Sequence, residues 1–511
     1  MSETHPTPSP APGKELSQDA RTAFVNGVKL AVSLIATWGV GLVVRFWLPR
    51  ALGPDRFGLF TFADGLAMTV LGCASLGTNA FVQKEVPVRP KEASDYYGGI
   101  VLIRLLLSAL LVIGLLVIPL GQREGEIRLL LLVFGVAYAV FALNATLAFM
   151  LQANTTVDEL AVANVVTKVV WGLGMAAGLL LHVPLAGLAA VLAFSESLKF
   201  GILHVIARKH IPLEIRLDAR ATLTTVRASL GFYAAALAHT VGARLDIALL
   251  GFLAHDSDVG WYGASASLAG ITFLLAPLLG SVLMPLMARA YERSPEEMLR
   301  AMRRAVEGLI AVTTPLALFL ALGADLCIQV VFGVAYAPAA GSLRTLAPLF
   351  VLTYLSIMLG LTLVVHGRGW RLTGIATTGI LTSITLALVL VPTFSRWLGP
   401  GGAGTGMALA AVAKEIVVLT GMLAALGSDV LDKHRRQVLA RTVGAALGTV
   451  AAHLVLAPLG HWRLAVDLGI YFALAVWFRA VKPGEVMALV RQLAAMRNER
   501  TDPPLPPTGL E

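Results

Sequence analysis

The residues of this sequence best suited to chemistry are charged side chains inside long apolar segments. The basic ones are Arg45, Arg104, Lys168, Lys199, Arg244 and Lys414, and the acidic ones are Asp64, Asp246, Glu307 and Glu415. Burying a charge in apolar surroundings costs free energy, so each residue is a candidate for function. Guanidinium and ammonium groups bind anions such as phosphates, and arginine can do so through two parallel hydrogen bonds. The carboxylates are candidates for coupling to H⁺ or Na⁺.

Each of these charges also has a simpler explanation. Arg45 lies near the end of its apolar run, where a long side chain can reach the membrane interface. Lys199 has Glu196 three residues before it on the same helix face, which favours a local ion pair. Arg244 and Asp246 are two residues apart, so they cannot face each other on a helix and each needs another partner. Ion pairing between helices therefore stays open as an alternative to ligand binding.

Composition places these charges in a membrane protein. The 511 residues are 57% hydrophobic and 14% charged, with a mean hydropathy of +0.77, whereas soluble proteins carry about 25% charged residues. Cys73 and Cys327 both lie in or beside apolar segments, which indicates neither a disulfide framework nor a metal cluster. No nucleophile–base arrangement is evident, so we predict no catalytic residue, no metal and no cofactor.

The apolar runs predict an all-α integral membrane protein with about fourteen membrane-spanning helices. They lie near residues 24–48, 58–82, 97–120, 127–152, 160–182, 184–206, 228–253, 259–288, 305–323, 343–366, 370–393, 403–426, 437–458 and 462–481. Most of the 40 Lys and Arg residues fall in alternate connecting segments. The positive-inside rule assigns these segments, and both chain ends, to the cytosol. The net charge of +9 is thereby explained as an orientation signal, which leaves no basic stripe for nucleic acid.

An internal repeat divides the chain into two lobes. RALGPDRFGLFTFADGLA (50–67) and LAHDSDVGWYGASASLAG (253–270) both follow an apolar run and both set an acidic residue before a glycine, Gly58 or Gly260. Six spans separate the copies, so both have one orientation, which predicts a parallel repeat with a binding site between the lobes. We interpret each short polar segment as a tight external turn with a structural role, in which glycine supplies unusual backbone angles.

The repeat and the composition define five regions. We predict a disordered cytosolic lead (1–20), a first six-helix lobe (21–210), a second six-helix lobe (211–427), two further helices (428–482), and a cytosolic amphipathic segment with a disordered tail (483–511). By the repeat, Arg45 of the first lobe falls beside Asp246 of the second. Both lobes would therefore place a charged residue at the same depth in the membrane, as a binding site shared by the two lobes requires.

Three stretches resemble bacterial polysaccharide exporters, the lipid-linked oligosaccharide flippases of the multidrug/oligosaccharidyl-lipid/polysaccharide exporter superfamily. The first is ALGPDRFGLFTFADGLA…LGTNAFVQKEV, similar to their N-terminal signature, and the second is RLDIALLGFLAHDSDVGWYGASASLAG…LMPLMARAYE, similar to its second-lobe counterpart. The third, VVFGVAYAPAAGSLRTLAPLF, resembles the external loop before their tenth helix. The similarity covers roughly residues 20–426. It implies two lobes in a V around a cavity, rocking between inward-open and outward-open states.

The resemblance implies a flippase that moves a polyprenyl-pyrophosphate-linked oligosaccharide from the cytosolic to the outer leaflet of the bacterial inner membrane, for surface polysaccharide assembly. Its expected partners are this glycolipid, membrane lipids and a membrane polysaccharide polymerase, with the chain itself a monomer. Such a head group needs a cationic cavity, so Arg104, Lys168, Arg244 and Lys414 are the leading candidates for pyrophosphate or sugar contacts. Arg45 and Lys199 are further candidates.

Three other functions fit the same apolar chain. A multidrug exporter of the same architecture would favour acidic and aromatic cavities for organic cations, whereas basic residues slightly outnumber acidic ones in the spans. A peptidoglycan-precursor flippase would also have fourteen helices, but the GPDRFG signature fits the polysaccharide branch better. An integral-membrane glycosyltransferase needs convergent carboxylates in acid–base or metal-binding roles, which this sequence does not offer.

Overall fold

The computed structural model describes residues 12–78, 93–119, 124–153, 157–210, 222–227, 244–271, 276–427 and 433–478, with a few single positions in between. All regular elements in these residues are helices. The α-helices are α1 (Pro12–Gly72), α3 (Ala93–Val117), α4 (Glu124–Ala153), α5 (Val157–Leu180), α6 (Leu185–His210), α8 (Leu245–Leu253), α9 (Asp256–Ile271), α10 (Ala276–Arg293), α11 (Pro295–Leu322), α12 (Ala324–Phe332), α13 (Ala339–Leu346), α14 (Leu349–Val365), α15 (Gly369–Leu398), α16 (Gly402–Leu426), α17 (Lys433–Val455) and α18 (Arg463–Trp477). The 3₁₀ helices are η1 (Cys73–Ser75), η5 (Val334–Tyr336) and η6 (Ala457–Trp462).

These helices occupy the apolar runs of the sequence. Within the described residues, ten helical stretches are long and apolar enough to cross a membrane by length and composition. Helix α1 begins at Pro12, inside the predicted lead, and the predicted C-terminal segment 483–511 lies outside the described residues. The stretch that resembles an external loop is itself helical over much of its length, because it contains η5 and α13.

Helix α1 covers the first two runs and turns back at Gly53. Gly53 has φ 75° and ψ 167°, a conformation open to glycine, and Pro54 follows it. Arg45 and Asp64 would lie about 28 Å apart on one straight helix. Both instead line the same cavity, since the reversal at Gly53 brings the two halves of α1 alongside one another.

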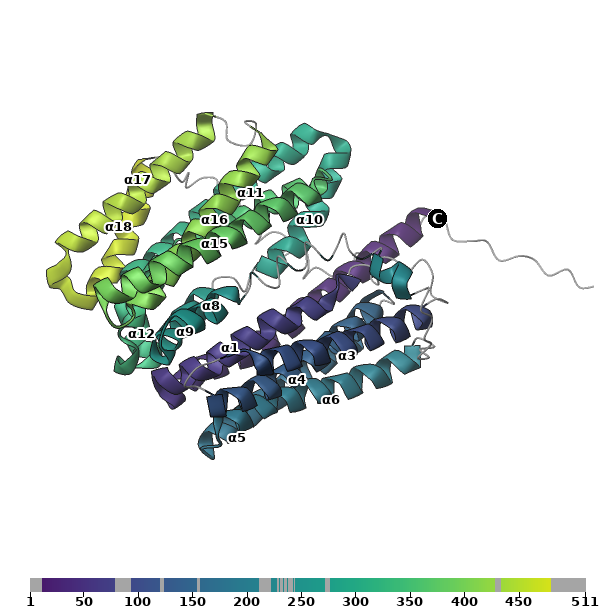
Figure 1. Ribbon diagram of the computed structural model, residues 1–511. Helices are drawn as coiled ribbons and strands as arrows, with labels where there is room; N and C mark the ends of the chain where they lie inside the picture. Colours follow the sequence, from purple (N-terminus) through teal and green to yellow (C-terminus); the bar gives the residue numbers. More distant parts are fainter. Residues whose placement is uncertain are drawn as a thin grey trace, which may run out of the picture.

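The helices form two bundles (Figure 1). Helices α1 and α3–α6 make up the first bundle, and helices α8–α16 make up the second. Helices α17 and α18 pack against α11 at the outer edge of the second bundle. The bundles meet where α1 contacts α8 and α9, and they diverge toward the end of the molecule where α1 begins. We call the end where they meet the Gly53 end.

Two glycines of the repeat form the closest contact at the Gly53 end. A Cβ atom at Gly58 would lie 1.7 Å from the carbonyl oxygen of Asp256, and one at Gly260 would lie 2.0 Å from that of Pro54. Gly58 and Gly260 are counterparts in the repeat, as are Pro54 and Asp256, so the contact is reciprocal. Both glycines lie inside helices, which corrects the interpretation of them as turn residues. Small residues at membrane-helix crossings allow backbones to approach this closely.

Tyr336 links the two bundles by a hydrogen bond beside these glycines. Its hydroxyl donates a 2.7 Å hydrogen bond to the Pro49 carbonyl oxygen, across the boundary between the bundles. Burial raises the pKa of the Tyr336 phenol, and the nearby Asp55 carboxylate raises it further. The phenol therefore stays protonated and keeps donating.

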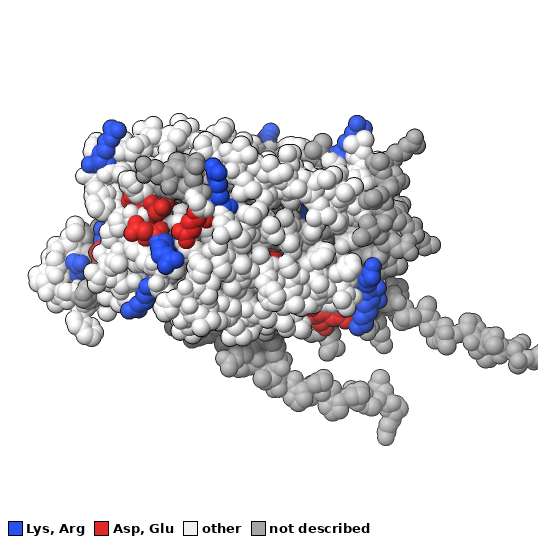
Figure 2. Space-filling view, turned by 60° about the horizontal axis from the view of Figure 1, so that its bottom comes forward, with Lys and Arg blue, Asp and Glu red and all other residues white. Residues whose placement is uncertain are grey.

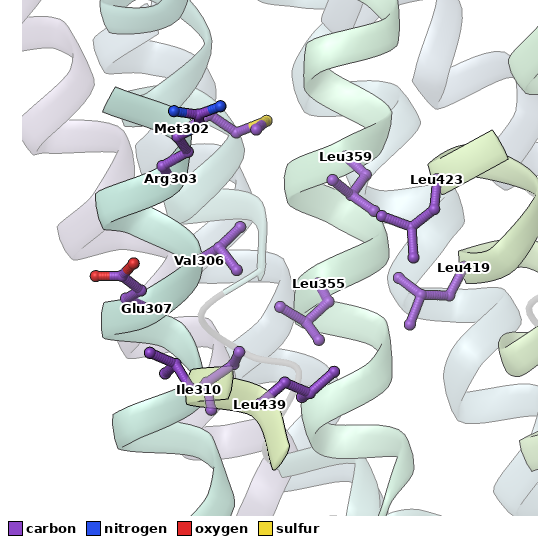
Figure 3. Close-up of a pocket in the computed structure, with 11 residues that line it drawn as sticks. Met302, Arg303, Val306, Glu307, Ile310, Leu355, Leu359, Leu419, Leu423 and Leu439 are labelled. Atoms are coloured by element: carbon purple, nitrogen blue, oxygen red, sulfur yellow. The ribbon is translucent and has the colours of Figure 1, made fainter. Parts of the chain in front are cut away.

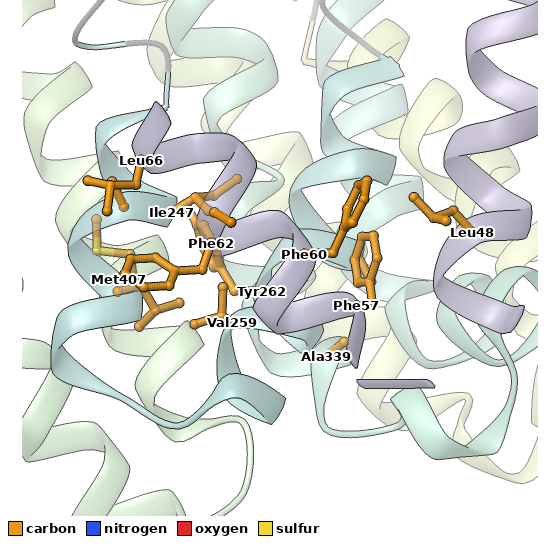
Figure 4. Packing of buried hydrophobic residues seen from close by; sticks show 14 of the residues in the cluster. Leu48, Phe57, Phe60, Phe62, Leu66, Ile247, Val259, Tyr262, Ala339 and Met407 are labelled. Atoms are coloured by element: carbon orange, nitrogen blue, oxygen red, sulfur yellow. The ribbon is translucent and has the colours of Figure 1, made fainter. Parts of the chain in front are cut away.

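The largest cluster of buried apolar side chains crosses from one bundle to the other (Figure 4). Phe62 of α1 is fully buried, and its ring covers Gly251 of α8. Ile247 and Met407 of the second bundle belong to the same cluster. Figure 2 shows one face of the molecule, on which most atoms belong to uncharged residues. A mostly uncharged outer surface is what contact with lipid requires.

Candidate functional site

A cavity of about 670 Å³ lies between the two bundles. Helices α1, α4 and α5 wall it on one side, and helices α8, α9, α15 and α16 wall it on the other. Its charged lining residues are Arg45, Asp64, Lys168, Arg244, Asp246 and Lys414. Six of the ten charged residues singled out in the sequence therefore line one cavity, and they come from four helices, α1, α5, α8 and α16.

The cations of the first bundle are held by packing. The guanidinium of Arg45 extends toward α9, where a Cβ atom at Gly270 would lie 3.3 Å from its Nη1. The Lys168 ammonium sits 3.5 Å from the centre of the Trp171 ring, and its side-chain stem packs against Gly41 of α1. An ammonium over an indole face is attracted by the ring's electron density.

The charges of the second bundle come from the start of α8 and the middle of α16. Arg244 occupies the N-cap position of α8 without a side-chain hydrogen bond to the helix, and Asp246 lies in the first turn. Lys414 lies on α16, and its stem packs near Gly379 of α15. Arg45 and Arg244 thus approach the cavity from opposite bundles.

The two carboxylates of the cavity are each engaged by a tyrosine. The hydroxyl of Tyr138 donates to Asp64 Oδ1 at 2.6 Å, and that of Tyr262 donates to Asp246 Oδ2 at 2.6 Å. No sequence pattern points to Tyr138. Tyr262 stands out only as the aromatic residue of the repeated phrase, so its hydrogen bond depends on the packing of α8 against α9.

The four cavity cations have no such partner. Within the described residues, none of Arg45, Lys168, Arg244 and Lys414 forms an ion pair closer than 4 Å. Arg45 is repelled by Arg244 and attracted, less strongly, by Asp64, so the two arginines keep a net repulsion across the cavity. Ion pairing between helices therefore does not account for these four cations, and an anion placed between the bundles would relieve their repulsion.

Arg104 lies elsewhere, in the packing between η1, α3 and α4. It is 1% exposed. Its Nη2 donates to the Ser75 carbonyl oxygen at 2.8 Å and to the Thr78 hydroxyl at 2.7 Å, and its Nη1 donates to the Ala142 carbonyl oxygen and the Thr146 hydroxyl. These acceptors fix the guanidinium inside the first bundle, which places it outside the cavity that the sequence predicted it to line.

Three other predicted residues also lie outside the cavity wall. Lys199 is half-buried on α6, and no ion pair joins it to Glu196 within the described residues. Glu307 lines a separate apolar pocket of about 50 Å³ between α11, α14, α16 and α17, with its carboxylate pointing away from Leu355 (Figure 3). Glu415 is 9% exposed on α16, beside the cavity residue Lys414. Lys414 and Glu415 are neighbours on α16, yet Lys414 lines the cavity and Glu415 is buried outside it.

The described residues contain no group of three or more His, Cys, Asp or Glu side chains that could hold a metal ion. Cys73 and Cys327 are both free thiols. The cavity wall itself offers cations, tyrosine-bound carboxylates and two indole rings, Trp38 and Trp171.

Solved structures define the class to which this fold belongs. The lipid II flippase MurJ in an inward closed conformation aligns with a TM-score of 0.68 at 12% identity, over 88% of this chain and 99% of that one. A multidrug resistance MATE transporter of the MOP superfamily, in its inward-facing conformation, aligns with a TM-score of 0.59 at 15% identity, over 76% and 98%. The Vibrio cholerae MATE transporter VcmN aligns with a TM-score of 0.53 at 12% identity, over 81% and 100%. The chain is a multi-pass membrane protein with the fold of MOP-superfamily transporters.

The family follows from the sequence itself. Residues 25–291 match the model of the polysaccharide biosynthesis protein family, and the chain belongs to that family. A comparison with curated protein sequences finds no match. Family and fold together make the chain a polysaccharide biosynthesis protein with the fold of MOP-superfamily transporters.

Proposed function

We propose that this protein is a flippase that moves a polyprenyl-pyrophosphate-linked oligosaccharide from the cytosolic to the outer leaflet of the bacterial inner membrane. The observation that carries the proposal is the set of four cations, two from each bundle, that line one cavity and form no ion pair with the residues that the structure describes. A pyrophosphate offers them several acceptor oxygens, and arginine can bind these in pairs. Membership of the polysaccharide biosynthesis protein family supports a glycan-bearing substrate.

The size of the cavity limits what it holds. A volume of about 670 Å³ is typical of small-molecule sites, which span about 300–1,000 Å³. The pyrophosphate and the first sugars would therefore occupy the cavity, with the polyprenyl tail left in the lipid. Trp38 and Trp171 line the cavity, where the first sugars would contact them.

Alternating access follows from the two-bundle arrangement. In the proposed topology, fourteen spans cross the membrane and both chain ends are cytosolic, so the Gly53 end is external and closed here. The cavity would then load its head group from the cytosolic side. Separation of α1 from α9 at the Gly53 end, with closure at the other end, would release it outside. We expect a monomer to suffice, with a membrane polysaccharide polymerase receiving the product.

Asp64 and Asp246 are the coupling carboxylates that this cavity offers. Each lies beside unpaired cations and accepts a hydrogen bond from a tyrosine. Exchange of H⁺ or Na⁺ at either one would change the charge of the cavity as the bundles move. Glu307 and Glu415 lie off the cavity wall, so they would act on it only indirectly.

Native mass spectrometry of the purified full-length protein tests the proposal. The protein is offered a polyprenyl-pyrophosphate sugar and, in parallel, a cationic dye. We expect selective retention of the pyrophosphate lipid, weakened about 30- to 150-fold by Arg244→Ala, since a hydrogen-bonded charge contributes about 2–3 kcal/mol. Arg396→Ala is the matched control, because Arg396 is exposed outside the cavity. Selective retention of the dye would instead identify a multidrug exporter.

A further inference from the structure

A second polar site lies behind the cavity, inside the first bundle. Glu196 is half-buried on α6 and does not line the cavity. Asn144 of α4 is 1% exposed and faces it. The Asn144 Nδ2 donates to Glu196 Oε2 at 2.8 Å and to the Glu196 backbone carbonyl oxygen at 2.9 Å. Both hydrogen atoms of the amide are thereby used, which fixes its orientation.

The other half of this amide has no partner. Asn144 Oδ1 is buried and accepts no hydrogen bond. Leaving a buried acceptor unpaired costs about 1–3 kcal/mol, and native proteins rarely tolerate it without a reason. A carboxylate beside this oxygen cannot donate to it. A carboxylic acid can donate to it when the oxygen that carries the proton turns toward the amide oxygen, while its other oxygen accepts from the amide N–H.

Two lysines lie within electrostatic reach of one another near this carboxyl group. Lys168 of α5 interacts with the charge of Glu196 more strongly than with any other carboxylate, and Lys199 of α6 lies near Lys168. The phenol of Tyr138 on α4 interacts electrostatically with the carboxylates of both Glu196 and Asp64. Lys168 lines the cavity and also lies near Glu196, because the residues that precede them are in contact, with the Ser195 hydroxyl donating to the Thr167 carbonyl oxygen at 2.9 Å.

We propose that Glu196 and Asn144 form a proton-binding site whose occupancy is linked to the binding of an anion at Lys168. One proton adds to Oε1 of the Glu196 carboxylate, and the resulting O–H donates to Asn144 Oδ1. No other bond forms or breaks, and Lys168 stays an ammonium ion. The proposal rests on the proposed function only in naming the anion, which is the phosphate group of the transported lipid.

The linkage follows from electrostatics. With the cavity empty, Lys168 favours the charged form of Glu196. An anion that binds at Lys168 offsets this influence and adds a negative charge nearby, so Glu196 takes up a proton when the anion binds. Release of the anion reverses the step. Protonation of Glu196 and binding of the anion in the cavity are thus coupled through the side chain of Lys168.

Proton uptake on anion binding tests the linkage. The purified full-length protein in detergent and weak buffer, with a pH-indicator dye, is titrated with polyprenyl pyrophosphate. We expect about one proton taken up per bound anion at a pH where the site is partly occupied. The variant Glu196→Gln should bind the lipid and take up none. Glu159→Gln is the control, because Glu159 is exposed and paired with Lys209 and His210, and it should match the wild type.

Infrared difference spectroscopy across a pH jump tests the site without any lipid. We expect a carboxylic-acid C=O band that Glu196→Gln abolishes and that Asn144→Ala moves to lower pH. A band unchanged in both variants would overturn the proton site. Loss of the band in saturating Na⁺, but not in choline at equal ionic strength, would overturn the assignment to a proton in favour of a metal cation.

The two experiments separate the two proposals. If the wild type binds the lipid with no Glu196-dependent uptake, the linkage is wrong and the flippase proposal stands. If the wild type binds no lipid, the flippase proposal is wrong, and the infrared measurement still decides whether Glu196 binds a proton.

Discussion

Gly58→Ala would place a methyl group where the backbone of α1 touches that of α9. The new Cβ would lie 1.7 Å from the Asp256 carbonyl oxygen and 2.9 Å from the Gly260 backbone nitrogen. Both neighbours are backbone atoms, so no side chain can rotate away. Carbon and oxygen atoms pack at about 3.5 Å, so the helices must separate by about 1.5–2 Å at this crossing. Gly260→Ala does the same from the opposite side, against Pro54.

The size of the effect follows from overpacking. Extra methyl groups in a close contact cost about 1–3 kcal/mol. This cost falls only on the state in which the Gly53 end is closed, so either variant should shift the equilibrium toward opening there by about 5- to 150-fold. Gly39→Ala is the matched control, because Gly39 lies on the same helix and a Cβ there has no atom within 4 Å.

The distance between two spin labels, measured with the protein in lipid, reports the shift toward opening of the Gly53 end. Spin labels are attached at Arg56→Cys on α1 and Val334→Cys on η5, both exposed at the Gly53 end, after Cys73 and Cys327 are replaced by alanine. We expect one short distance in the parent protein and in Gly39→Ala. The Gly58→Ala and Gly260→Ala variants should add a longer one.

An unchanged distance distribution in both folded glycine variants would refute this reasoning. It would mean that the contact is not what holds the Gly53 end closed. Because a clash can also unfold a protein, each variant is compared with the parent for melting temperature before it is labelled.

Three further results are expected. Tyr336→Phe removes the hydrogen bond to Pro49 without any clash, so it should raise the open population about 5- to 10-fold in the same distance measurement, for a cost of about 1–1.5 kcal/mol. Arg104→Met should lower the melting temperature, since it leaves the Ser75 carbonyl oxygen and the buried Thr78 hydroxyl without their guanidinium donor at a cost of about 1–3 kcal/mol for a buried acceptor, yet leave lipid affinity per folded molecule unchanged. Ser257→Cys in the cysteine-free background should react with a membrane-impermeant thiol reagent in intact cells, and protection there would reverse the proposed orientation.

Much of the fold could be predicted because lipid imposes simple requirements on sequence. Apolar runs long enough to span a bilayer mark the helices, and the repeated phrase marks related segments of the two bundles. The role of the repeated glycines could not be predicted. Gly58 resembles a turn residue in sequence, yet the turn uses Gly53, and Gly58 is needed for a contact with α9 that only the assembled bundles create.

The candidate site was predictable to the level of residue type and depth. Arg104 and Lys168 lie at similar depth in their runs, so the sequence treats them alike. The structure separates them through helix rotation, which turns Arg104 toward Thr78 and Thr146 and turns Lys168 toward the cavity. Neutral hydrogen-bond partners decide which of two similar cations faces the cavity and which stays inside a bundle. A threonine hydroxyl, a carbonyl oxygen or the amide of Asn144 gives no charge pattern to read in advance.

Direct measurement of lipid movement tests the central claim most closely. The full-length protein is reconstituted in liposomes with a fluorescent polyprenyl-pyrophosphate sugar, and a membrane-impermeant quencher reports each molecule that reaches the outer leaflet. The cationic cavity predicts fast movement in the parent protein and in Arg396→Ala, and movement at least about 10-fold slower when Arg45 and Arg244 are both replaced by alanine. Equal rates in the double variant and the parent, or no movement beyond that of protein-free liposomes, would contradict the claim.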